Sequence, residues 1–292
     1  MRGSVIVVSY NRAFLLSHCV EKLLDQSAED YEVIVVDDGS TDATFELMSK
    51  IHDSRFIHLR NKENMGQPLA RNRGIKKAKG DVIIFVDSDV LVDENFIKDY
   101  LKLHEKNNRL IVQGMVRHIK KLQDYGRFTL RIDGLCLVGL VTQNVSVRKK
   151  WLEEVGGLDE SFGNIMGYED IEMGRRLKGI GLSTVYAWRS CLAWHVDGYE
   201  TDERLKSVFS KAYMFGKNAV RFSKMYGKRV AARHLKKNYV YLITRLFGTD
   251  QWVEDKGVKY ILSHRDSFIY PILKWVIKYH YRAKGIREAM KE

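Results

Sequence analysis

Cysteine and proline are scarce in this chain of 292 residues. Its three cysteines, Cys19, Cys136 and Cys191, lack the close spacing of a disulfide framework or a cysteine-rich zinc site, and they fit a reducing compartment. The two prolines, Pro68 and Pro271, exclude a proline-rich linker. No apolar run approaches the roughly 18 residues that a membrane span needs, and no secretory leader is apparent. We therefore expect a soluble, cytoplasmic protein.

Positive charge is in excess, and it is unevenly distributed. The chain holds 49 basic and 37 acidic residues, a formal net charge of +12. Residues 201–292 contain 21 of the basic and only 8 of the acidic residues, so residues 1–200 are close to neutral. Apolar residues make up 45%, which is ordinary for a folded protein. The split predicts two domains, a neutral body over 1–200 and a basic, mainly helical region over 201–292.

Short β-branched runs alternate with helical periods along the first half of the chain. The expected strands are Ser4–Ser9, Tyr31–Val36, Phe56–Arg60, Val82–Val86, Leu110–Val116, Thr142–Val147 and Thr184–Ala193. The expected helices are Phe14–Gln26, Asp42–His52, Gln67–Ala78, Asp93–Lys106, Tyr168–Lys178, Glu203–Tyr226, Ala231–Phe247 and Tyr270–Lys291. This order predicts an α/β fold, doubly wound around a mainly parallel sheet and flanked by helices, with a C-terminal helical extension.

Polar residues follow the strands where a parallel sheet binds ligands, at the carboxyl ends. The first strand ends in Ser9, Tyr10, Asn11 and Arg12, and the second is followed by residues 37–42. Asp87, Ser88 and Asp89 follow the fourth strand, and two carboxylates at this spacing can reach Mg²⁺ or Mn²⁺. An ordinary capped turn is the alternative for such a triplet. The position in the fold favours a nucleotide and a divalent cation.

Further candidate residues lie after the second and third strands. The carboxylate of Asp38 could accept the imide N–H of a uracil or the donors of a guanine, although a plain strand-to-helix loop is the better explanation when this segment is taken alone. Gly66 and Arg71 lie at the start of a helix, where backbone N–H groups and a guanidinium can bind phosphate. A surface arginine is the simpler reading of Arg71.

Acidic residues also begin the helix expected at 168–178. Glu169 and Asp170 lie in its first turn, where the helix dipole favours an ionised carboxylate, as a general base requires. A helix-start acid followed by a Glu172–Arg176 pair is the alternative. His195 ends a strand-like stretch, and a lone histidine is more often packed or solvated than a ligand.

Taken together and in order, these motifs resemble the family 2 glycosyltransferases of the GT-A fold. The resemblance covers roughly residues 3–196, through SVIVVSYNR, VVDDGSTD, NMGQPLARNRGIKKAKGDVIIFVDSD, QNVSVRKKWLEEVGGLDESF and GYEDIEMGRRLKGIG followed by Trp194-His195. It implies catalysis by Asp170, with Glu169 beside it, and a metal site at Asp87, Asp89 and His195. It implies that the nucleotide-sugar contacts Ser9, Tyr10, Asn11, Arg12, Asp38, Gly66, Arg71, Asp87 and Ser88.

The expected activity is therefore a Mn²⁺- or Mg²⁺-dependent, inverting transfer of a hexosyl or N-acetylhexosaminyl group from a nucleotide-sugar, with UDP favoured. The acceptor would be a glycan, a peptide or a lipid-linked molecule. Processive relatives carry a Gln-x-x-Arg-Trp motif and membrane spans, and this sequence has neither, which favours single addition. A nucleotidyltransferase and a nucleic-acid-binding protein are the alternatives; the second rests on the basic region alone, and no nucleic-acid-binding signature occurs.

For the basic region itself, our hypothesis is that its helices dock on an anionic membrane surface, at the inner face, or present an acidic or lipid-linked acceptor. The alternative is a solvated face on helices that pack onto the catalytic domain or form a homodimer.

Overall fold

The computed structural model describes residues 1–127, 132–133, 140–163, 167–198, 202–227, 250–263 and 270–291. Contacts within the chain divide it into two compact units. The first comprises Met1–Asn164 and Glu169–Gly198, and the second comprises Ile165–Tyr168 and Tyr199–Glu292. We call the first the sheet unit and the second the helical unit, and each is described by itself.

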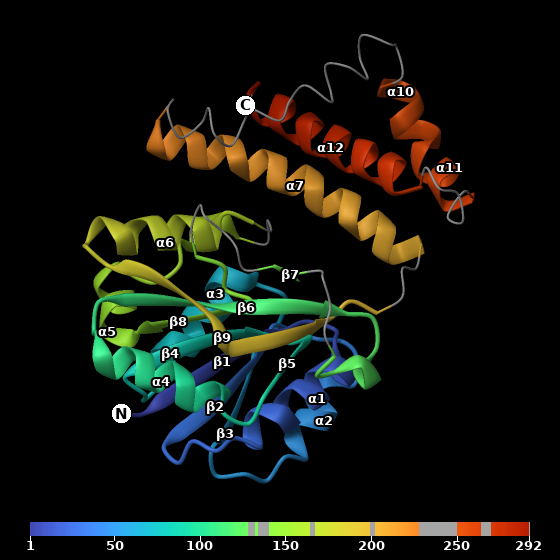
Figure 1. Cartoon of the computed structure of the whole chain (residues 1–292). Coiled ribbons are helices and arrows are strands. Elements are labelled where there is room, and N and C mark those ends of the chain that lie inside the picture. The colour runs from blue at the N-terminus through green and yellow to red at the C-terminus, as the bar shows by residue number, and fades with distance from the viewer. Residues whose placement is uncertain are drawn as a thin grey trace. The chain divides into compact units, whose positions relative to one another are not determined.

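The sheet unit is built on a mixed sheet that has nine strands in the described residues, in the order β3-β2-β1-β4-β8-β6-β9-β5, with β7 paired to β6 (Figure 1). The strands are β1 (Gly3–Ser9), β2 (Tyr31–Asp37), β3 (Phe56–Arg60), β4 (Val82–Asp87), β5 (Val90–Val92), β6 (Leu110–Ile119), β7 (Ile132–Asp133), β8 (Asn144–Arg148) and β9 (Ser183–Val196).

Strand direction changes across this sheet. The four strands β3, β2, β1 and β4 are parallel, which confirms the predicted βαβ half. Strand β8 is antiparallel to both β4 and β6, whereas β6 and β9 pair in parallel. Strand β5 is antiparallel to β9. The sheet is thus doubly wound in its first half and mixed in its second.

Helices cover both faces of the sheet, because β1 and β2 each contain the apolar run VIVV and so present apolar side chains on both faces. One core layer packs α1 (Ala13–Leu24) and α4 (Phe96–Lys106) against Val5, Val7 and Val33. The opposite layer packs α3 (Gln67–Lys77), α5 (Lys149–Glu154) and α6 (Glu169–Gly179) against side chains such as Ile6 and Ile34. The remaining short helices are α2 (Thr44–Ser49), η1 (Leu122–Asp124) and η2 (Glu160–Phe162).

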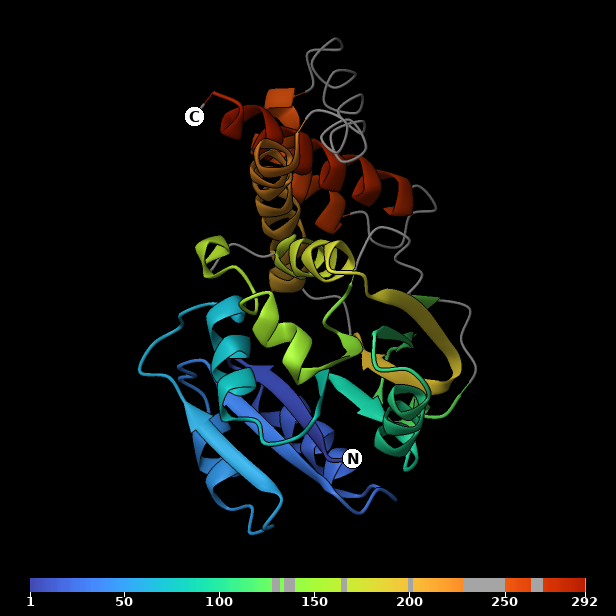
Figure 2. The same cartoon turned by 90° about the vertical axis from the view of Figure 1, so that its left-hand side faces the viewer.

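The helical unit contains α7 (Asp202–Tyr226), α10 (Asp250–Trp252), η3 (Val253–Gly257), α11 (Val258–Ser263) and α12 (Tyr270–Ala289). Helices α7 and α12 lie side by side in Figures 1 and 2. They cross at two glycines, since a Cβ at Gly216 would overlap the carbonyl of Arg282, and one at Gly285 that of Tyr213. The helices predicted over 203–226 and 270–291 are confirmed, and the helix predicted over 231–247 lies outside the described residues.

A short segment just before α6 packs with the helical unit. The ring of Tyr168 is buried against Phe215 and Phe222, with centroids 4.6 and 5.3 Å away. Its hydroxyl accepts a hydrogen bond from Arg282, and Asn218 donates one to the carbonyl of residue 167. Tyr168 has a positive φ of 79°, a left-handed conformation that is rare for an aromatic residue. These contacts hold it directly before Glu169, the first residue of α6.

None of the helices in the described part of the chain combines the length and the apolar character that crossing a membrane requires.

Candidate functional site

The loops after β1 and β2 are tied together by Asn11. Its backbone N–H donates to the hydroxyl of Ser40 at 2.9 Å, and its side-chain oxygen accepts from the backbone N–H of Thr41 at 2.7 Å. Asn11 adopts a φ of 51°, a region that asparagine tolerates better than most residues. Tyr10 beside it is exposed, while Ser9 is buried and its hydroxyl has no hydrogen-bond partner. The segment 9–12, which holds candidate nucleotide-binding residues, is thus hydrogen-bonded to the loop after β2.

The carboxylate of Asp38 is buried and is hydrogen-bonded within the chain. It accepts hydrogen bonds from the side chain of Asn61 at 2.6 Å and from the backbone N–H groups of Met65 and Gly66 at 3.0 and 2.9 Å. It therefore joins the loop after β2 to the start of α3. Gly39 follows with a φ of +77°, and a side chain there would overlap the backbone of Glu63. Contact between Asp38 and a base stays a prediction.

Asp87 and Asp89 contact different basic side chains. Asp89 is 6% exposed; its Oδ2 contacts Arg12 and lies 3.1 Å from Nε2 of His195. The antiparallel pairing of β5 with β9 causes this approach, because it sets Val90 opposite His195. The Oδ1 of Asp87 lies 3.3 Å from Arg71. A carboxylate oxygen and an imidazole nitrogen that face each other are donors suited to Mn²⁺ or Mg²⁺, so Asp89 and His195 fit the predicted cation.

Arg71 connects the aspartate motif after β4 to the start of α6. It is 4% exposed; one guanidinium nitrogen contacts Asp87, and the other lies 3.6 Å from the carboxylate of Glu169 without a hydrogen bond. Burial and the neighbouring Glu169 charge raise the pKa of Asp170 to about 7. Arg71 and the backbone N–H groups of Ile171 and Thr142 oppose this rise. The site thus holds a carboxyl group whose pKa suits proton transfer near neutral pH.

Two residues beside His195 were not predicted from the sequence. His118 lies opposite His195 on the adjacent strand β6, and its Nδ1 is 3.1 Å from the carboxylate of Asp197. The Nδ1 of His195 lies 3.1 Å from the same carboxylate oxygen. These three residues form a group that could hold a metal ion. Nothing in the sequence marks His118, since it is 77 positions from His195 and belongs to no motif.

A comparison with protein-family models identifies the family of this chain. The model described as glycosyl transferase family 2 matches residues 4–156. The chain belongs to glycosyl transferase family 2. This confirms the resemblance drawn from its motifs.

Curated relatives of this family 2 glycosyltransferase match half of the chain or less. Glycosyltransferase GlyG of Streptococcus pneumoniae is 35% identical over 153 residues, which are 50% of this chain and 49% of the relative. The poly(ribitol-phosphate) beta-glucosyltransferase of Bacillus spizizenii is 32% identical over 41% of the chain and 20% of its own length. The Escherichia coli enzyme WfaP, a UDP-Glc:alpha-D-GlcNAc-diphosphoundecaprenol beta-1,3-glucosyltransferase, is 42% identical over 30% of the chain and 34% of its own. The matched segments span about half or less of each of these relatives.

Solved structures confirm the fold. The mannosyltransferase PcManGT from Pyrobaculum calidifontis, in complex with GDP-Man and Mn²⁺, matches with a TM-score of 0.63 and 16% identity, covering 99% of this chain and 87% of that one. Residues 1–349 of TarS from S. aureus, in complex with UDP-GlcNAc, match with a TM-score of 0.59 and 16% identity over 100% and 92% of the two chains. The predicted GT-A fold with its C-terminal helical region is thus confirmed for this glycosyltransferase.

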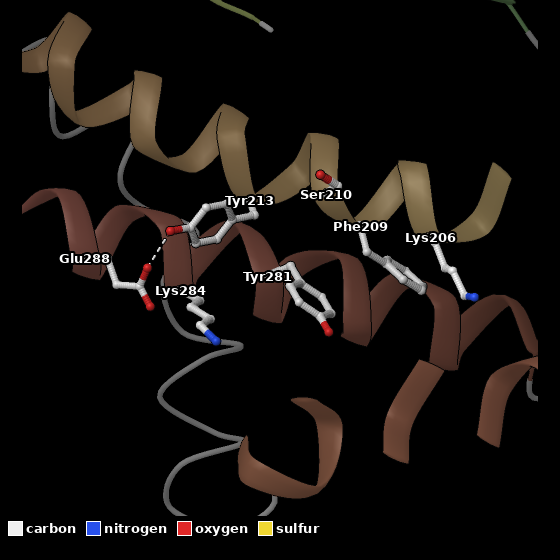
Figure 3. A pocket seen from close by; sticks show the side chains of 7 residues that line it. All are labelled: Lys206, Phe209, Ser210, Tyr213, Tyr281, Lys284 and Glu288. Carbon is white, nitrogen blue, oxygen red and sulfur yellow. Dashed lines mark hydrogen bonds between the residues drawn. The ribbon is translucent and has the colours of Figure 1, made fainter. Parts of the chain in front are cut away.

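The helical unit of this family 2 glycosyltransferase has a cavity of its own, of about 450 Å³, between α7 and α12 (Figure 3). Its lining combines aromatic rings, two lysines and a hydrogen-bonded acid: Lys206, Phe209, Ser210, Tyr213, Tyr281, Lys284 and Glu288. The hydroxyl of Tyr213 donates to Glu288. The rings of Phe209 and Tyr281 stack, with centroids 5.7 Å apart. Aromatic faces beside ammonium groups can bind a sugar that carries a phosphate.

Proposed function

We propose that this chain transfers a sugar from a nucleotide-diphospho-sugar to a hydroxyl of an acceptor, with a divalent cation and with inversion at the anomeric carbon. The observation that carries the proposal is that Arg71 lies against both Asp87, in the aspartate motif after β4, and Glu169, the first of the two carboxylates that begin α6. The residues proposed to bind the donor and those proposed to accept the proton are therefore adjacent to the same buried guanidinium, that of Arg71. Membership of glycosyl transferase family 2 supports this reading.

Asp89 and His195 would hold the cation, with Asp87 beside them. When bound, a divalent cation offsets the negative charge that builds up on a leaving nucleoside diphosphate. Arg71 adds a fixed positive charge that costs no reorganisation, because its guanidinium is already held by Asp87 and Glu169. We infer that the loop residues Tyr10 and Arg12 contact the nucleotide.

Asp170 is the proposed general base. Its carboxylate accepts the proton of the acceptor hydroxyl while the hydroxyl oxygen bonds to the anomeric carbon, and the bond from that carbon to the diphosphate oxygen breaks. A single displacement of this kind inverts the configuration. The raised pKa of Asp170 makes it a stronger base than an ordinary aspartate, and Arg71 keeps part of it ionised.

A panel of UDP- and GDP-sugars, each incubated with and without Mn²⁺, tests the proposal. We expect the release of nucleoside diphosphate from one donor, with UDP favoured, and its loss when a chelator removes the metal. Single addition predicts one added sugar per acceptor in mass spectrometry. Salt-sensitive RNA binding without any hydrolysis would instead support a nucleic-acid-binding protein.

For the acceptor, we propose a phosphate-bearing glycan or lipid-linked glycan that contacts the cavity of the helical unit. Lys206 and Lys284 supply positive charge beside the aromatic rings of that cavity. The names of two relatives, which act on poly(ribitol phosphate) and on a diphosphoundecaprenol-linked sugar, support this class. Alanine at Lys206 and Lys284 should raise the KM for the acceptor about tenfold or more and leave donor hydrolysis unchanged. Lys256→Ala, an exposed lysine of the same unit outside the cavity, is the matched control.

We also propose that α12 attaches the chain peripherally to an anionic membrane. Its exposed Ile272 and Trp275 alternate with Lys274 and Lys278, the composition of an interfacial helix. Co-sedimentation with anionic vesicles should weaken as salt is added. Equal binding to neutral and anionic vesicles, or none to either, would contradict it.

A further inference from the structure

The imidazole of His195 lies between two carboxylates. Its Nε2 is 3.1 Å from Oδ2 of Asp89, and its Nδ1 is 3.1 Å from Oδ1 of Asp197. The Nδ1 atom is buried and has no aligned hydrogen bond in the structure. A buried ring nitrogen that carries a proton needs an acceptor, and the Asp197 oxygen lies within reach of a slight turn of the ring.

Asp197 is itself held in place from the neighbouring strand. Strands β6 and β9 run parallel here, in a register that sets His118 opposite His195. The Nδ1 of His118 hydrogen-bonds to Oδ1 of Asp197 at 3.1 Å, and the two imidazole rings lie 5.0 Å apart. The backbone N–H of Asp197 donates to the carbonyl of Ile119, which fixes the chain at this end of the strand pair.

We propose that Asp197, supported by His118, is a positioning residue that directs Nε2 of His195 toward the cation shared with Asp89. A neutral imidazole carries its proton on one nitrogen and its lone pair on the other. A carboxylate at Nδ1 keeps the proton there, so the lone pair is left on Nε2, and it makes that nitrogen a better ligand. This inference rests on the proposed function, in which Asp89 and His195 hold a divalent cation.

A competing arrangement uses the same three side chains differently. His118, His195 and Asp197 could hold the cation themselves, since their donor atoms lie close together. His195 would then give its Nδ1 lone pair to the metal, and Nε2 would carry the proton and face Asp89. The two arrangements differ in the number of histidine nitrogens bound to the metal, one in ours and two in the competing one.

Electron paramagnetic resonance of Mn²⁺ can separate them. The purified chain is titrated with Mn²⁺, with and without UDP, and nitrogen couplings are recorded at saturating metal. We expect Asp197→Ala to weaken Mn²⁺ binding by about 10–100-fold while the single nitrogen coupling persists. Asp197→Asn, which keeps an oxygen acceptor, should recover part of the affinity. His195→Ala should abolish the coupling, and His118→Ala should retain it.

Asp53→Ala removes a half-buried carboxylate that is paired with Arg55 elsewhere on the sheet unit, and it serves as the matched control. Unchanged Mn²⁺ affinity in both Asp197 variants would overturn the proposal. Loss of a nitrogen coupling in His118→Ala would also overturn it, and so would the absence of Mn²⁺ binding by the parent chain. Circular dichroism confirms that each variant is folded, and Asp197→Asn provides the test if the alanine variant is not. Sugar transfer is not measured here, so a failure of this proposal is distinguishable from a failure of the donor-hydrolysis test.

Discussion

Replacing Asp170 by asparagine should abolish sugar transfer and, at the same time, stabilise the folded chain near neutral pH. The two effects have one cause. Burial and the charge of Glu169 make the ionised form of Asp170 unfavourable in the folded state, and they raise its pKa to about 7. Asparagine has nearly the same shape but cannot accept the acceptor's proton, and it carries no charge to be desolvated.

The magnitude follows from the difference between the folded and unfolded pKa of Asp170. The folded value of about 7 lies roughly three pH units above the ordinary value of 3.8. Each unit corresponds to about 1.4 kcal/mol, which sets an upper limit of about 4 kcal/mol. Solvent reaches part of this side chain and screens the effect, so about 1–3 kcal/mol is expected.

The sign depends on pH. Because the folded pKa is raised, the folded state binds the proton more tightly than the unfolded state does. The parent chain therefore loses stability as the pH rises from about 4 to about 7. The advantage of Asp170→Asn should be close to zero at about pH 4 and complete by about pH 8.

Urea denaturation of both proteins across this pH range measures the stability difference, and nucleoside diphosphate release measures turnover. Donor binding, followed by calorimetry, should change little, whereas turnover should fall by orders of magnitude. The control is Glu172→Gln on the same helix. Glu172 contacts Arg176 at 2.5–3.0 Å, so its loss should destabilise the chain by about 1–3 kcal/mol. Normal turnover in Asp170→Asn, or an asparagine variant that is no more stable at about pH 8 than the parent, would refute the reasoning.

Three further outcomes are expected. The kcat/KM for transfer should fall as the pH drops below about 7, because Asp170 must be ionised in the free enzyme to act as a base; a kcat/KM that stays flat to about pH 5 would contradict this assignment. Asp38→Ala should lower the free energy of unfolding by about 1–3 kcal/mol in urea titrations, since three donors, two of them in buried hydrogen bonds, lose their acceptor. Gly216→Ala should lower the melting temperature, because its Cβ would overlap the carbonyl of Arg282, whereas Gly179→Ala, which has open space, should not.

The sequence predicts the first half of the fold well, because strands β1, β2 and β4 are apolar on both faces and the helices between them have clear periods. Strand β5 could not be predicted. It has three residues and directly follows the aspartate motif, so its pattern cannot be told from a turn. The antiparallel direction of β8 was also missed, because strand direction depends on the connection rather than on the strand's own residues.

The sequence predicts which residues belong to the candidate site better than it predicts the contacts between them. Polar residues that follow strands can be found from the pattern, and the carboxyl ends of β1, β2 and β4 hold them. The contact between Asp89 and His195 arises from the β5–β9 pairing, which joins residues 106 positions apart. The contacts of Asp38 with the start of α3 depend on backbone N–H groups, which no sequence pattern marks.

The burial of Tyr168 among the helices has a consequence for how such enzymes can be recombined. The chain passes from the sheet unit to the helical unit after Gly198. Residues 165–168 also belong to the helical unit, and they directly precede α6. A chimera that exchanged only the residues beyond 198 would leave Tyr168 without Phe215, Phe222 and Arg282. A new helical unit must therefore bring its own version of this segment, so that the helical unit and the residues directly before α6 are exchanged together.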